Sequence, residues 1–86
     1  MSLVDLRRAL KEEKLKFGIK ETLKLIKREK IKEVFISDNC PEDWVMRLKK
    51  YCEISNVKYT KLKENSKELG IICKKSFSVS VCSYLK

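Results

Sequence analysis

The spacing of hydrophobic and polar positions predicts four helices, because apolar residues recur every three or four positions over four stretches. Leu3, Leu6 and Leu10 show this spacing in the first stretch. Asn65 and Glu68 have the spacing of a capping box, which marks the start of the fourth. The predicted helices cover residues 3–14, 18–30, 41–55 and 66–73.

Four further stretches predict strands. The segment EVFIS at 33–37 is nearly all apolar and contains β-branched and aromatic residues, which is typical of a strand covered on both faces. The segment LKF at 15–17 is short, and VKYTKL at 57–62 alternates between polar and apolar residues. In FSVSVCSY at 77–84, large apolar residues alternate with serines, which predicts a strand covered on one face only.

Helices and strands therefore alternate along the chain, which indicates an α/β protein with one sheet between helices. In open sheets of this kind, ligands usually bind where strands end and helices begin. Gly18 and Asn39 occupy two such junctions. The length of 86 residues predicts one domain, residues 1–86, with a ligand site in a surface cleft rather than in a deep internal cavity.

The net charge of the chain indicates its class of binding partner rather than its fold. It carries 21 Lys+Arg against 12 Asp+Glu, a formal net charge of +9. Such an excess favours polyanionic partners, with nucleic acid first and an anionic membrane surface second. No stretch approaches the roughly 18 apolar residues of a membrane span, and the first 14 residues do not have the pattern of a signal peptide.

The cysteines and the absence of histidine argue against a metal site and against catalysis. The four cysteines form no C-x-x-C pair, so no local turn presents two ligands to one metal. We expect them to be buried free thiols in a reducing cytoplasm. The chain has no histidine, the commonest general base, so we expect neither catalytic residues nor a cofactor.

Four segments, taken in order, are similar to one known family. GIKETLK at 18–24, SDNCP at 37–41, ELGIIC at 68–73 and KSFSVSVCSYL at 75–85 together resemble the ribosomal protein L-thirty-e family, within the L-seven-Ae superfamily of kink-turn RNA-binding proteins. The resemblance implies a three-layer α/β/α sandwich with a four-stranded mixed sheet. It also implies a cytoplasmic, non-catalytic protein that binds a kink-turn in ribosomal RNA. The alternatives are a non-ribosomal ribonucleoprotein and a protein-interaction adaptor, in which Trp44 or Tyr84 would belong to a docking surface.

The resemblance assigns RNA contacts to the second predicted helix. Gly18 matches the family glycine at which an RNA backbone approaches closely, and Lys20 matches a lysine that contacts a guanine edge. Glu21 matches an acid that accepts from base amino groups, while Lys24, and Lys75 outside this helix, are expected to contact phosphates. Without the resemblance, Gly18 would be an ordinary turn glycine and the charged residues a solvated helix face.

The remaining assignments lie outside this helix. Asn39 matches an asparagine that contacts a base edge, although it equally suits a turn or a helix cap. Phe77 matches an aromatic residue that stacks on an extruded base, although the alternation would also suit a core position. For Gly18, Asn39 and Phe77 to meet one RNA, the last strand must run antiparallel to the central one. Lys74 replaces a glycine that relatives carry, which would alter the loop containing Phe77, and acids at 38, 42 and 43 flank Asn39.

Overall fold

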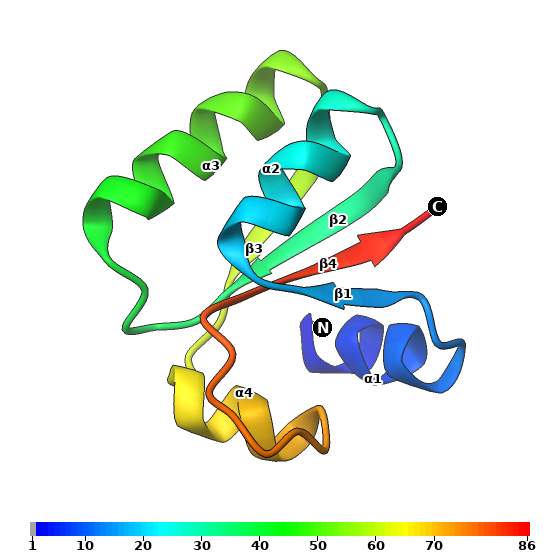
Figure 1. The fold of residues 1–86 in the computed structure, drawn as a ribbon, viewed down its shortest axis with the longest axis vertical. Coiled ribbons are helices and arrows are strands. Elements are labelled where there is room, and N and C mark those ends of the chain that lie inside the picture. The colour runs from blue at the N-terminus through cyan, green and yellow to red at the C-terminus, as the bar shows by residue number, and fades with distance from the viewer. Residues whose placement is uncertain (1) are drawn as a thin grey trace.

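The computed structural model describes residues 2–86, with side chains from residue 4 onward, and shows the helices and strands that the alternating pattern predicts. The side chain of Leu3, assigned to the apolar face of the first helix, lies outside this described part. The helices are α1 (Ser2–Lys11), α2 (Ile19–Lys27), α3 (Glu42–Ile54) and α4 (Ser66–Ile72), and the strands are β1 (Leu15–Phe17), β2 (Ile31–Ile36), β3 (Lys58–Lys61) and β4 (Val81–Leu85) (Figure 1).

Each helix is followed by a residue other than glycine in the left-handed backbone conformation, and this is why the helices are shorter than predicted. The φ angle of Lys74, after α4, is 59°, and the N–H of Lys75 donates to the carbonyl of Gly70 at 2.8 Å. This is the hydrogen bond of a Schellman motif, which satisfies carbonyls that a helix end leaves free. The equivalent left-handed residues of α1, α2 and α3 are Glu13, Glu29 and Asn56. No helix in residues 2–86 is both long and apolar enough to cross a lipid bilayer.

The four strands form one mixed sheet in the order β1-β4-β2-β3, as the resemblance implies. Strands β2 and β3 are parallel, whereas β4 pairs antiparallel with both β1 and β2. Cys82 of β4 lies opposite Phe17 on one side and opposite Phe35 on the other. The predicted antiparallel course of the last strand is therefore confirmed, and this strand lies in the interior of the sheet.

Helices cover both faces of the sheet, so the three-layer arrangement is also confirmed (Figure 1). Successive residues of β2 point to opposite faces. Phe35 packs in a core with α1 and α4, while Val34 and Ile36 pack in a core with α2 and α3. All three side chains are fully buried, which confirms that this strand is covered on both faces. The four cysteines are buried as free thiols, and burial raises the pKa of Cys52 to about 11.

The prediction of a one-sided strand at 77–84 is wrong in two respects. The strand begins at Val81, and residues 77–80 form a loop that lies on α4. Val79 is buried by packing against the α1 and α4 core, which produces the alternation without a strand. Ser83 is also buried, because α2 covers the second face, and its hydroxyl hydrogen-bonds the Thr22 hydroxyl at 3.1 Å.

Candidate nucleic-acid interface

One edge of the sheet brings together segments from both ends of the sequence. Strand β1 ends there, at the turn into α2, and β4 begins there. The N–H of Gly18 donates to the carbonyl of Val81 at 3.0 Å, and the N–H of Ser37 donates to the carbonyl of Ser80 at 2.8 Å. These bonds fix the loop before β4 beside the start of α2, as the antiparallel arrangement requires.

Glycine is needed at position 18 because of the backbone conformation there, and not because a side chain would lack space. Its φ is +106° and its ψ is 149°, a combination that L residues rarely adopt, and a Cβ built on it would meet no atom within 4 Å. Gly18 is the N-cap of α2, and both the N–H and the hydroxyl of Thr22 donate to its carbonyl. The corner is therefore rigid, exposed and without a side chain, so another molecule can approach its backbone closely.

Beside Gly18 lies an open cavity of about 670 Å³. Its polar lining includes Lys20 and Glu21 from the first turn of α2. Its apolar walls come from β1, α3 and the loop before β4, and they include three aromatic side chains: Phe17, Trp44 and Phe77. A mostly apolar hollow with a few charged groups at its rim suits a flat, partly polar group such as a nucleobase.

Phe77 is a surface residue and not a core residue. Its side chain is 53% exposed, and its ring meets Phe17 edge to face, with the centroids 6.5 Å apart and the planes at 82°. The Nζ of Lys75 lies 4.9 Å from the centroid of the Phe17 ring. An exposed ring held by an aromatic neighbour and flanked by a cation is well placed to stack on an unpaired base.

The lysines of α2 separate into a front and a rear group. Lys20 lines the cavity, and Lys24 is exposed one turn further along the helix. Lys27 lies over the Tyr51 ring of α3, with 5.5 Å between its Nζ and the ring centroid. The structure thus brings Gly18, Lys20 and Glu21 to the cavity, whereas Lys24 lies outside its lining.

Asn39 does not line the cavity, although it lies at the same end of the molecule. Its Oδ1 accepts from the Ser66 N–H at 2.8 Å, and its Nδ2 donates to the Ser66 hydroxyl at 3.2 Å. These bonds tie the loop after β2 to the first residue of α4. The predicted capping box between Asn65 and Glu68 is present at the same helix start.

Sequence reasoning did not assign Phe17 or Trp44 to the RNA site. The sequence identifies Phe17 only as the end of a strand, although an aromatic residue directly before the corner glycine is an available signal. The sequence identifies Trp44 only as a helix-lining or docking residue, and nothing in its local sequence indicates that α3 places it on the cavity. The guanidinium carbon of Arg47 lies 5.1 Å from the centroid of the Trp44 ring, which adds a cation beside this wall.

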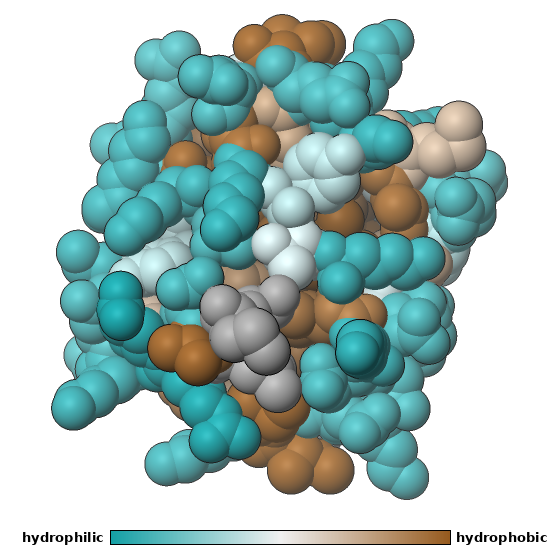
Figure 2. All heavy atoms as spheres, turned by 180° about the vertical axis from the view of Figure 1, so that it is seen from behind, coloured by the Kyte–Doolittle hydropathy of each residue, from teal (hydrophilic) through white to brown (hydrophobic). Residues whose placement is uncertain are grey.

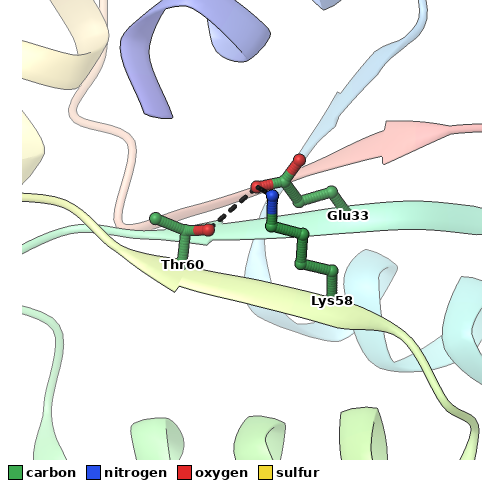
Figure 3. A network of polar contacts seen from close by, with 3 residues as sticks. All are labelled: Glu33, Lys58 and Thr60. Carbon is green, nitrogen blue, oxygen red and sulfur yellow. Dashed lines mark hydrogen bonds and ion pairs between the residues drawn. The ribbon is translucent and has the colours of Figure 1, made fainter. Parts of the chain in front are cut away.

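The cations of this edge form no ion pairs within residues 2–86. The one ion pair in that part of the chain joins Lys58 and Glu33 at 4.0 Å, and the Thr60 hydroxyl donates to the same carboxylate at 2.8 Å (Figure 3). Glu33 lies toward the start of β2, away from the cavity at the other end of that strand.

Hydrophilic residues dominate the face of the molecule seen from behind, with hydrophobic patches between them (Figure 2).

Comparison with known proteins agrees with this architecture. The family model described as the ribosomal protein L7Ae/L30e/S12e/Gadd45 family matches residues 3–86. The chain is similar to the large ribosomal subunit protein eL30 of Sulfurisphaera tokodaii, with 33% identity over 76 residues that cover 88% of this chain and 72% of that protein. The eL30 protein of Saccharolobus solfataricus is 31% identical over 81 residues, which cover 94% of this chain and 75% of the relative.

A solved structure is similar over nearly the same length. The Giardia lamblia 15.5kD RNA binding protein matches with a TM-score of 0.83 and 28% identity, covering 93% of this chain and 67% of that one. Sequence and structure comparisons thus agree over almost all of the described residues. The chain belongs to the ribosomal protein L7Ae/L30e/S12e/Gadd45 family.

Proposed function

We propose that this protein is a non-catalytic RNA-binding protein of the large ribosomal subunit, and that it recognises and stabilises a kink-turn in ribosomal RNA. The observation that carries the proposal is the convergence of Gly18, Lys20, Glu21 and Phe77 on one cavity. The names of the eL30 relatives support the ribosomal assignment over another ribonucleoprotein particle. A ribosomal role would place the protein in the cytoplasm.

The groups that line the cavity and the lysines near it have distinct roles in the proposal. A base extruded from the RNA enters the cavity and stacks on Phe77, which is worth about 1–3 kcal/mol per stacked base. Lys20 donates to guanine O6 and N7 where the bend widens the groove, and Glu21 accepts from a base amino group. Lys24 and Lys75 contact phosphates of the strand that passes them.

Asn39 keeps hydrogen-bonding capacity for a base edge. Its amide has two donor hydrogens and two acceptor lone pairs, and the contacts with Ser66 use one of each. The side chain is exposed, so the remaining donor and acceptor face solvent. Asn39 therefore serves both as a tie between two loops and as a candidate base contact.

Stabilisation of the bend follows from differential affinity. Only a bent RNA presents an extruded base and a widened groove together, so the protein binds the bent form more tightly and shifts the RNA toward it. Because lysines supply many of the contacts, affinity falls as salt concentration rises.

The test compares a synthetic kink-turn hairpin with a straight duplex of matched length, using fluorescence anisotropy at fixed salt. We expect clear preference for the hairpin, and Phe77→Ala to weaken hairpin binding about 5- to 150-fold, the equivalent of about 1–3 kcal/mol. Ile54→Ala is the matched control, because Ile54 is also an exposed apolar side chain but lies at the end of α3, outside the cavity lining. Equal affinity for the two RNAs would refute kink-turn recognition.

A further inference from the structure

A second hollow lies on the other side of the loop that carries Phe77. It has a volume of about 300 Å³ and is lined by α4 and by the loop itself. Its polar side chains come from Lys67, Lys75, Ser76 and Ser78, and Gly70 and Phe77 are also part of its lining. Phe77 and Ser78 belong to both hollows, so the loop forms the wall between the apolar cavity and this polar one.

The polar groups of this hollow are hydrogen-bond donors of the kind that bind a phosphate. Lys67 is an exposed ammonium, and both serine hydroxyls are on exposed residues. Within residues 2–86, the backbone N–H groups of Ser76, Phe77 and Ser78 donate to no other protein group. Among the described residues, no aspartate or glutamate lines the hollow. A cation, hydroxyls and free amides without an acid are suited to an anion.

The loop is fixed to α4 at both of its ends, which defines the shape of the hollow in advance. The Lys75 N–H donates to the Gly70 carbonyl at 2.8 Å, and the Val79 N–H donates to the Ser66 carbonyl at 2.9 Å. Between these bonds, the carbonyl oxygen of Phe77 would lie 2.3 Å from a Cβ placed on Gly70. Because the loop is held before the ligand arrives, little ordering of the protein is needed on binding.

We propose that this hollow is a phosphate subsite for the nucleotide backbone next to the base stacked on Phe77. A base in the apolar cavity leaves its sugar and phosphates outside, and the loop wall is thin enough that Phe77 and Ser78 line both hollows. The strand then passes over the loop, with the base on one side and an adjacent phosphate on the other. The inference rests on the proposed function and adds Lys67, Ser76 and Ser78 to the RNA contacts.

The decisive variant is Lys67→Gln, with Lys63→Gln as its matched control. Both lysines are exposed, lie four residues apart and lose one charge, but only Lys67 lines the hollow. We expect Lys67→Gln to weaken binding of the kink-turn hairpin about tenfold, as for a lost charge-assisted hydrogen bond. Lys63→Gln should weaken it about twofold, through loss of diffuse attraction alone. Urea unfolding midpoints verify that both variants fold, since lysine and glutamine have similar helix propensities.

A chemical change in the RNA locates the phosphate. Each phosphate of the bend is replaced in turn by an uncharged methylphosphonate. One position should weaken binding to the unaltered protein about tenfold but weaken binding to Lys67→Gln clearly less, because one partner of that phosphate is already missing. If the two lysine variants weaken binding equally, the proposed subsite is wrong. It is also wrong if every methylphosphonate affects both proteins alike. In either case, a loss of affinity in Phe77→Ala still supports the proposed function. If Phe77→Ala and the RNA shape have no effect, the proposed function itself is wrong.

Discussion

Replacement of Gly70 by alanine tests whether the loop carrying Phe77 depends on its close contact with α4. The new Cβ would lie 2.3 Å from the carbonyl oxygen of Phe77 and 3.3 Å from its carbonyl carbon. Both are backbone atoms, so no side-chain rotation relieves the overlap. The loop must move away from the helix by about 1 Å to restore ordinary contact distances, because packed interiors leave no free space.

The size of the effect follows from two opposing terms. Forcing a methyl group into a packed site costs about 1–3 kcal/mol. Alanine is the better helix former and returns about 0.5–1 kcal/mol inside α4. We therefore expect Gly70→Ala to lower the free energy of unfolding by about 1–2 kcal/mol, measured by urea denaturation. An unfolding free energy equal to or above that of the unaltered protein would show that the loop relaxes freely.

The same substitution should weaken RNA binding through Phe77. Displacement of the loop moves the ring away from Phe17 and from the cavity, so affinity for the kink-turn hairpin should fall by up to the full stacking contribution of about 1–3 kcal/mol. In a protein that already carries Phe77→Ala, Gly70→Ala should still reduce stability but should change affinity little. If Gly70→Ala weakened binding by the same factor in the Phe77→Ala protein as in the unaltered one, Gly70 would act by a route other than the aromatic ring.

Four further predictions concern other residues. Lys74→Gly should raise the free energy of unfolding by about 1 kcal/mol in urea denaturation, because glycine adopts the left-handed φ of 59° without strain; a loss of stability would contradict this. Asn39→Ala should lower it by about 1 kcal/mol through loss of the bonds to Ser66, and an unchanged urea midpoint would show that this tie is dispensable. The Tyr84 hydroxyl donates to Glu12 and lowers the pKa of that carboxyl below its ordinary value of 4.5. The stabilisation by this hydrogen bond is therefore present above pH 4.5 and is lost as pH falls through the lowered pKa of Glu12. Tyr84→Phe should accordingly destabilise the protein more at pH 7 than at pH 3, and NMR titration should show the pKa of Glu12 rising. Lys24→Gln should reduce the slope of log affinity against log salt by about 0.7–0.9, and an unchanged slope would mean that Lys24 contacts no phosphate.

The order of elements and the doubly covered β2 were predictable because each depends on local spacing, whereas the direction of β4 followed from the RNA contacts that the family resemblance implies. Gly18 was recognisable by its place between a strand and a helix and by its match to the family glycine. The local features are encoded within a few neighbouring positions. They account for the layers of the fold and for one corner of the candidate site.

Contacts between distant segments were not predictable from spacing. Asn39 and Ser66 are 27 residues apart, so the hydrogen bonds between them leave no local pattern. The burial of Val79 beneath α4 imitated the alternation of a strand and placed the predicted start of β4 four residues too early. Trp44 reaches the cavity only because α3 packs beside α2 in the folded protein.

The position of β4 has a consequence for synthesis of the protein. This strand comes last among the described elements, yet it lies between β1 and β2 in the sheet. While a growing chain is still being made, those two strands have no partner between them, and the segment containing Phe77 has no anchor on the Gly18 side. We therefore expect recognition of RNA to require β4, so that a chain interrupted before this strand competes poorly for the same RNA.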